Sequence, residues 1–406
     1  MLGWELPPHN SGGLGVACYY LSKALGIKGL AIDFMVPHEP TTQYEHFKVI
    51  GTTNISAQDV LISGAGAYGS FCANCESRTC EHSFPTDLRS LQARYTKFVE
   101  RYLQKNVPDV IHAHDWLTFE AAILAKKLTS KPLIAHVHAT EFDRSGEFDG
   151  NPLVHDIEYN GLIFADHIIA VSQATKDLIV HRYGIPADKI SVVHNSLDPS
   201  EFEVSLDPAN SYRYIEEMKR RGFSVVISVG RLTIQKGLRY LLEAAKYTIE
   251  ANPKVLFVLA GSGEQRNELI ELSAELGISA NILFTDFVRG KQLRDIYRIG
   301  DVFVMSSISE PFGLTALEAA QSGTAICLSK QSGVGEVLKD VFRFDYWDTQ
   351  KLANQLISLT THPSLLGTMQ QNLHEDVNRM SWDKTADKIL HIYQKYTQPV
   401  SLEATL

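Results

Sequence analysis

The sequence has few cysteines and no long hydrophobic run. Its five cysteines are an odd number scattered over 406 residues, which is not the pattern of a disulfide framework. No apolar stretch approaches the roughly 20 residues that a membrane-spanning helix needs. The first residues, Met1 to Glu5, show neither the basic start nor the apolar core of a secretory signal. We therefore expect a cytoplasmic protein with no integral membrane segment.

Positive charge is also scarce. The 38 lysines and arginines are outnumbered by 47 acidic residues, which gives a net charge of −9. This balance argues against nucleic acid or an anionic membrane as the main partner. The hydrophobic content of 44% and charged content of 21% are those of a soluble globular protein. At 406 residues the chain is long for a single core, so two domains are expected.

Short apolar runs alternate with helical patterns along most of the chain, which indicates parallel sheets covered by helices on both faces. The expected strands of the first series are residues 30–36, 110–113, 133–137, 168–171 and 190–193. Those of the second series are residues 225–229, 255–260, 282–285, 302–305 and 324–328. A further strand is expected at residues 60–62, and the first strand, before residue 5, is expected to be either very short or truncated. The sequence therefore predicts an α/β protein of two doubly wound, Rossmann-like domains that face a central cleft.

The charged, unpatterned stretch near residues 200–222 is the expected connection between these domains. We assign residues 1–200 to the first domain and residues 201–383 to the second. The last helix follows the second series, so residues 384–406 are expected to return to the first domain.

Ligands of such sheets bind beyond the carboxyl ends of the strands. Two His-x-His pairs lie there, His112 with His114 and His136 with His138. A metal-dependent hydrolase is a rival interpretation, but it needs further ligands around a barrel, and eight strand–helix repeats are not found. We expect His112 and His136 to be satisfied by neighbours. His138 is expected to be functional, because Thr140 and Glu141 follow it at the strand end.

A second candidate metal site lies earlier in the chain. Four soft ligands occur within eleven positions, and they could hold zinc. Their spacing matches no common zinc finger, and loop cysteines are often plain thiols. The four residues are Cys72, Cys75, Cys80 and His82.

Residues 309–323 lie between two strand-like runs and are the most informative stretch. A helix that opens near Phe312 would expose the backbone N–H groups at residues 313–315, and such a helix end attracts an anion such as phosphate. Glu310 would precede that end, and Glu318 would lie inside the helix. Eight helical residues span about 12 Å, roughly the distance between the two sugar rings of a nucleotide-sugar. The alternative is an ordinary strand–helix–strand unit with two solvated carboxylates.

Two glycine-containing loops precede helical patterns. Gly12 and Gly13 would let the backbone approach a bulky anion closely. After the strand at residues 225–229 come Arg231 and Lys236, two cations that could neutralise a departing diphosphate. The alternative is a pair of surface cations, although a positive charge at a helix start is mildly unfavourable.

Together these residues resemble the retaining nucleotide-sugar glycosyltransferases of the GT-B fold, in the group 1 and glycogen/starch synthase superfamily. The resemblance runs from about residue 3 to residue 396. It rests on the order and spacing of several segments. They are residues 11–15, 112–116 and 193–195, His138, Gly230-Arg231 with Lys236-Gly237, and Glu310 with Glu318.

The resemblance implies roles for the matching residues. Arg231 and Lys236 would hold the donor diphosphate, Glu310 the donor sugar and Glu318 the ribose. His138 would line the donor-sugar site, and Asp115 would lie on the acceptor side. The remaining donor contacts would come from Gly12, Gly13, Gly313, Leu314 and Thr315 around the diphosphate, and from Asp286, Phe287 and Val288 around the base.

The implied reaction keeps the anomeric configuration and needs no metal or other cofactor. The sequence lacks the Asp-x-Asp metal motif of the other main glycosyltransferase fold. We expect transfer of a hexose, with glucose favoured, from ADP-glucose or UDP-glucose to a growing α-glucan. The alternatives are a group 1 enzyme with a small or lipid-linked acceptor, an inactive binding or regulatory protein of this fold, and a nucleotide-sugar epimerase.

Overall fold

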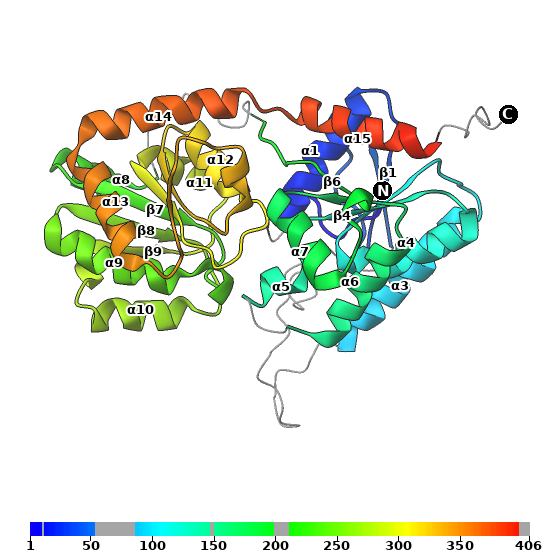
Figure 1. Ribbon diagram of the computed structural model, residues 1–406, viewed down its shortest axis with the longest axis horizontal. Helices are drawn as coiled ribbons and strands as arrows, with labels where there is room; N and C mark the ends of the chain where they lie inside the picture. Colours follow the sequence, from blue (N-terminus) through cyan, green and yellow to red (C-terminus); the bar gives the residue numbers. More distant parts are fainter. Residues whose placement is uncertain (10–11, 53–85, 147–149, 199–210, 398–406) are drawn as a thin grey trace. The chain divides into compact units, whose positions relative to one another are not determined.

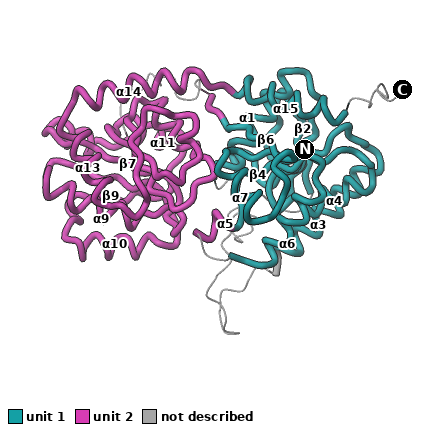
Figure 2. Tube along the Cα trace, in the orientation of Figure 1, with its two compact units in different colours: residues 1–141, 149–195, 382–406 teal, residues 142–148, 196–381 magenta. Residues whose placement is uncertain are grey.

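The computed structural model describes residues 1–9, 12–52, 86–146, 150–198 and 211–397. The expected strand at residues 60–62 and the candidate zinc ligands Cys72, Cys75, Cys80 and His82 lie outside these ranges. The chain divides into two compact units (Figure 2). Unit 1 comprises residues 1–141, 149–195 and 382–406, and unit 2 comprises residues 142–148 and 196–381. Across the described ranges, no helix combines the length and hydropathy needed to cross a membrane.

Unit 1 contains a parallel sheet, as the apolar runs predict. Leu2 forms single parallel bridges to Met35 on one side and Ala113 on the other, so the first strand is reduced to this one bridging residue. This residue lies between the β1–β2 ladder and the ladder of order β3-β4-β5-β6. The strands are β1 (Asp33–Val36), β2 (Lys48–Gly51), β3 (Ile111–His114), β4 (Leu133–Val137), β5 (His167–Ala170) and β6 (Ile190–Val192).

Helices complete unit 1 (Figure 1). They are α1 (Gly13–Ile27), α3 (Thr86–Leu103), α4 (Trp116–Thr129), α6 (Pro152–Phe164), α7 (Gln173–Tyr183), α15 (Trp382–Thr397) and the 3-10 turn η1 (Ala187–Lys189). The short helix α5 (Glu141–Arg144) spans the boundary between the units. The core lies where the apolar strand residues meet the helices, and Phe34, Ala113 and Ile134 are fully buried there.

The C-terminal helix α15 packs on α1 within unit 1 (Figure 1). The ring of Trp382 stacks on that of Tyr20, with centroids 6.0 Å apart. Lys28 at the end of α1 forms ion pairs with Asp383 at 2.6 Å and Asp387 at 2.7 Å. Apolar stacking and charge pairing therefore attach the end of the chain to the first unit.

Unit 2 has one parallel sheet of order β12-β11-β10-β7-β8-β9. The chain starts in the middle with β7, adds β8 and β9 on one side, and then crosses over to β10 on the other. The crevice beyond the carboxyl ends of β7 and β10 is therefore the topological switch point, where ligands of such sheets bind. The strands are β7 (Ser224–Val229), β8 (Val255–Ala260), β9 (Ile282–Thr285), β10 (Val302–Met305), β11 (Ala325–Ser329) and β12 (Phe342–Phe344).

The helices of unit 2 follow the same alternation. They are α8 (Arg213–Arg220), α9 (Leu238–Ala251), α10 (Arg266–Glu275), α11 (Gly290–Ile299), α12 (Leu314–Gln321), α13 (Thr349–Thr361) and α14 (Pro363–Asn378), with the 3-10 turns η3 (Ile234–Lys236), η4 (Ser279–Asn281) and η5 (Gly333–Glu336). Leu238, Leu241 and Leu242 are buried on α9, which packs against α10 and α13. Helix α12 packs against α11 and α14.

Candidate functional site

A pocket lies at the switch point of unit 2. It opens to solvent. Its lining comes from the ends of β7 and β10 and from the segments that follow them. Four of the residues that the sequence singled out are among those that line it: Arg231, Lys236, Glu310 and Thr315.

The backbone after β7 is shaped by glycines. Gly237 has a φ of +60°, and a Cβ atom there would lie 2.3 Å from the carbonyl oxygen of Ser306. This close approach brings the segment after β10 against the turn that carries Lys236. The Ser306 hydroxyl then donates to the Lys236 carbonyl oxygen at 3.0 Å. Only glycine adopts this conformation and allows this close approach at low cost. The backbone geometry therefore explains why a glycine follows Lys236.

The charged side chains meet inside the pocket. Lys236 Nζ forms an ion pair with Glu310 Oε2 at 2.5 Å, and the Ser307 hydroxyl donates to the same carboxylate oxygen at 3.1 Å. The Lys236 and Glu310 side chains are only 21% and 11% exposed, so water screens the pair weakly. Arg231 Nη2 donates to Gln235 Oε1 at 3.3 Å. Two cations and one carboxylate leave the pocket with a net positive charge, which favours an anionic ligand.

Glu310 is held in place through its backbone. Its N–H donates to the carbonyl oxygen of Gln331 at 3.1 Å, and its carbonyl oxygen accepts from Gly333 N–H at 2.9 Å. In addition, Gln235 Nε2 donates to the carbonyl oxygen of Ser309 at 3.0 Å. The carboxylate therefore sits on a segment fixed both by η5 and by the turn after β7.

The helix of the 309–323 stretch begins later than the sequence indicated. We expected an opening near Phe312, but α12 begins at Leu314. The carbonyl oxygen of Phe312 accepts from Val334 N–H at 2.7 Å, which ties that residue to η5. Gly313 follows in a left-handed conformation, with a φ of +109°. The first helical turn therefore contains the N–H groups of Leu314 and Thr315, while Gly313 precedes it.

Glu318 lies inside α12, as expected. Its Oε2 accepts from the Tyr297 hydroxyl at 2.6 Å. Burial and then the Glu318 carboxylate raise the pKa of Tyr297 well above its usual value, so this hydroxyl remains a donor. Glu318 does not appear among the described residues that line the pocket.

The expected base contacts, residues 286–288, follow the edge strand β9. Asp286 pairs with Arg266 at 3.7 Å, and the Arg289 guanidinium lies 4.6 Å from the centroid of the Phe287 ring. Phe287 is half exposed. Within the described ranges, residues 286–288 are not part of the pocket lining.

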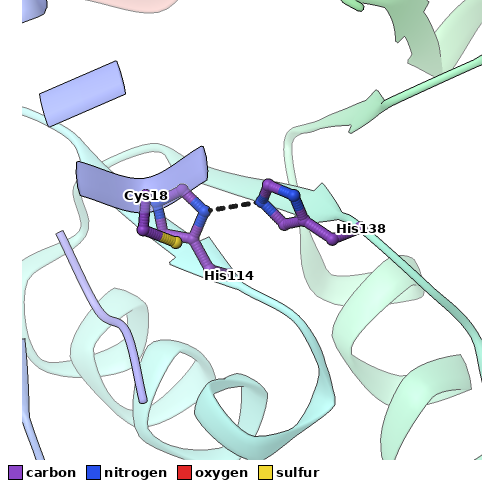
Figure 3. A group of neighbouring side chains, drawn as sticks. All are labelled: Cys18, His114 and His138. Atoms are coloured by element: carbon purple, nitrogen blue, oxygen red, sulfur yellow. Dashed lines mark hydrogen bonds between the residues drawn. The ribbon is translucent and has the colours of Figure 1, made fainter. Parts of the chain in front are cut away.

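The candidate residues of unit 1 gather at the ends of β3 and β4. Asp115 Oδ1 accepts from the backbone N–H of His138 at 2.6 Å and from that of Ala139 at 3.4 Å. His138 Nε2 lies 3.0 Å from His114 Nδ1 (Figure 3). Burial lowers the pKa of His138 to about 3, so its imidazole is neutral at physiological pH. Gly12 and Gly13 lie at the start of α1, which begins at Gly13.

The other two strand histidines differ from each other. His112 Nδ1 contacts the Tyr393 hydroxyl, and its Nε2 lies 3.1 Å from His136 Nδ1, so His112 is satisfied by neighbours as expected. For His136 the expectation holds at Nδ1, which makes this contact with His112, but its buried Nε2 has no hydrogen-bond partner among the described residues.

Sequence reasoning missed three residues of these clusters. Gln235 and Ser307 position the charged groups of the pocket, and Cys18 from α1 lies beside His114 (Figure 3). Gln235 stands between the two predicted cations and could have been noticed. Cys18 occupies an ordinary helix position, and no local pattern distinguishes it.

Two family models match successive parts of the chain. The model described as Glycosyltransferase Family 4 matches residues 11–201, and that described as Glycosyl transferases group 1 matches residues 216–376. An uncharacterized glycosyltransferase of Methanocaldococcus jannaschii is 28% identical, and the match covers 97% of each chain. A glycogen synthase of Mycobacterium tuberculosis is 27% identical over 83% of this chain and 79% of its own.

A solved structure shares the fold. The crystal structure of HepE from Anabaena in complex with UDP-glucose superposes with a TM-score of 0.73 at 19% identity, and covers 97% of this chain and 98% of its own. This likeness, together with the two parallel sheets, places the chain in the GT-B fold.

Proposed function

Because the chain belongs to the group 1 glycosyltransferases, we propose that it transfers a hexose, with glucose favoured, from a nucleoside-diphosphate sugar to a sugar hydroxyl with retention of configuration. ADP-glucose and UDP-glucose are the favoured donors, and a growing α-glucan is the favoured acceptor. The observation that carries this proposal is the convergence of Arg231, Lys236 and Glu310 on one pocket at the switch point of unit 2.

The pocket suits the charge changes of the reaction. The bond between the anomeric carbon and the diphosphate oxygen breaks, and negative charge grows on the diphosphate. Arg231 and Lys236 are fixed cations that stabilise this charge without rearranging, which is where electrostatic catalysis acts. The N–H groups of Leu314 and Thr315 in the first turn of α12 add partial positive charge.

Glu310 has two tasks in this scheme. Its carboxylate holds Lys236 in place, and it can accept hydrogen bonds from hydroxyls of the donor sugar. The new bond forms on the face that the diphosphate leaves, and the acceptor proton passes to a diphosphate oxygen. No side chain acts as a covalent nucleophile, and the chemistry requires no metal. From the family pattern we assign His138 to the donor sugar, Asp115 to the acceptor and Glu318 to the ribose.

The acceptor is supported less directly than the donor. Similarity to a glycogen synthase favours a glucan. A small or lipid-linked acceptor is the alternative within the same reaction class, and an inactive binding protein is the alternative outside it. The presence of both cations and of Glu310 in one pocket favours an active enzyme.

A panel assay tests the proposal. The protein is incubated with nucleotide-sugars, with and without maltooligosaccharides, and nucleoside diphosphate release is measured. We expect release from UDP-glucose or ADP-glucose that increases with maltooligosaccharide. Release that glucan leaves unchanged would assign the enzyme to a different acceptor. If a folded sample releases diphosphate from no donor, the enzyme proposal is wrong.

A further inference from the structure

Three soft side chains converge inside unit 1. Cys18 comes from α1, His114 from the end of β3, and His138 from the segment just after β4 (Figure 3). All three are buried, and the sulfur and one ring nitrogen from each histidine lie within 4.8 Å of one another. Such a grouping of one thiol and two imidazoles has the composition of a transition-metal site.

The spacing of the two imidazoles suits a shared ion. His114 Nδ1 and His138 Nε2 are 3.0 Å apart. Two nitrogens that each bind zinc at 2.0–2.1 Å in a tetrahedral site lie about 3.3 Å from each other. The observed contact is a hydrogen bond between the two rings, so an ion would replace it, and both rings would turn to direct these nitrogens at the ion.

Hydrogen bonding leaves part of this cluster unsatisfied. The Nε2 atoms of His114 and His136 are buried and have no hydrogen-bond partner in the part of the chain that the structure describes. A neutral imidazole carries one proton, so whichever nitrogen holds it, each ring has one unsatisfied polar atom.

The surrounding charge favours a cation. The carboxylates of Asp115 and Glu5 lie close enough to Cys18 to act on it electrostatically. Both carboxylates are themselves buried, at 6% and 2% exposed. They would attract a divalent cation, and a thiol that coordinates such an ion loses its proton to solvent. The site would then hold a thiolate, two nearby carboxylates and a compensating ion.

We propose that Cys18, His114 and His138 bind one divalent transition-metal ion, for which Zn²⁺ is the best fit. A thiolate with two imidazoles selects zinc-like ions over Mg²⁺ or Ca²⁺, which prefer oxygen ligands. Three protein ligands leave a fourth coordination position for water. The ion would bind His138, which the proposed function assigns to the donor sugar. Metal binding would therefore compete with sugar transfer and take no part in it.

Cobalt substitution tests the site directly. Co²⁺ replaces Zn²⁺ in tetrahedral sites, and a cobalt–thiolate bond adds a charge-transfer band in the near ultraviolet. The assay uses full-length protein in which Cys72, Cys75 and Cys80 are replaced by serine, so that only Cys18 and Cys327 can supply a thiolate. We expect one equivalent of Co²⁺ to produce the band, and excess Zn²⁺ to abolish it.

Matched variants locate the ligand. Cys18→Ser should lose the band and at least about tenfold in affinity. Cys327→Ser, at a buried cysteine of unit 2, should keep both. Thermal melts and circular dichroism confirm that each variant folds, and Cys18→Ala serves if the serine variant does not. The proposal is overturned if no metal binds. It is also overturned if the thiolate band survives Cys18→Ser. Metal binding without the thiolate band would overturn it as well, and would place the ion at another group, such as His112, His114 and His136.

Discussion

Replacing Lys236 by alanine should separate catalysis from stability. The residue lies at the switch point, 2.5 Å from Glu310, with its side chain 21% exposed. Removing one preorganised cation from the leaving group costs about 3 kcal/mol of transition-state stabilisation. Since about 1.4 kcal/mol corresponds to a factor of ten, we expect turnover to fall roughly 100-fold.

The same unit offers a control. Lys219 pairs with Asp301 at 2.8 Å with similar exposure, 33% and 21%. Asp301 precedes β10, so this pair lies at the opposite end of the sheet from the pocket. Losing the more exposed Lys219 pair should lower the free energy of unfolding by about 1 kcal/mol. Losing the more buried Lys236 pair should lower it at least as much, because the Glu310 carboxylate is left without its cation. Lys219→Ala should keep turnover within about threefold of the wild type.

Two measurements decide the comparison. Urea unfolding gives the stability of the three proteins, and nucleoside diphosphate release at saturating donor gives turnover. The reasoning is refuted if Lys236→Ala keeps near-normal turnover while folded. It is equally refuted if Lys219→Ala loses as much turnover as Lys236→Ala, because the effect would then not depend on the pocket.

Three further predictions concern stability and metal. Burial lowers the pKa values of His112, His114, His136 and His138 in unit 1. Only the unfolded chain therefore binds protons at these residues as the pH falls below about 6.5, and each should lower the free energy of unfolding by up to about 1.4 kcal/mol per pH unit. Urea unfolding at pH 7.5 and 5.5 should show a loss of several kcal/mol, and equal stability would contradict the burial of these rings. Gly237→Ala should lower the melting temperature much more than Gly277→Ala does. Both glycines have a positive φ, but only at Gly237 would an added Cβ lie 2.3 Å from a backbone oxygen. Equal melting temperatures of the two variants would refute this explanation. One equivalent of Zn²⁺ should inhibit the wild type through His138, with recovery on chelation, and inhibition of Cys18→Ser to the same degree would assign it elsewhere.

The sequence predicts the sheets well because buried parallel strands are continuous apolar runs. The runs at residues 255–260 and 302–305 coincide with β8 and β10. Since pocket residues follow strand ends, the positions of Arg231 and Glu310 could be inferred from the same pattern.

Tertiary contacts determine the features that the hydrophobic pattern of the sequence does not predict. The start of α12 depends on a hydrogen bond from Val334 to Phe312, and these residues are far apart in sequence. The ion pair of Lys236 with Glu310 also joins residues that are distant in sequence. The grouping of Cys18 with two histidines results from the packing of α1 against the ends of β3 and β4, which local periodicity does not encode.

The most direct test of the central claim is binding of nucleoside diphosphate to the pocket of unit 2. Isothermal titration calorimetry with UDP and ADP compares the wild type, Lys236→Ala and Lys219→Ala. We predict that the wild type and Lys219→Ala bind one equivalent of at least one of these ligands, and that Lys236→Ala binds it at least about tenfold more weakly. Failure of the folded wild type to bind either diphosphate, or equal binding by all three proteins, would contradict the account.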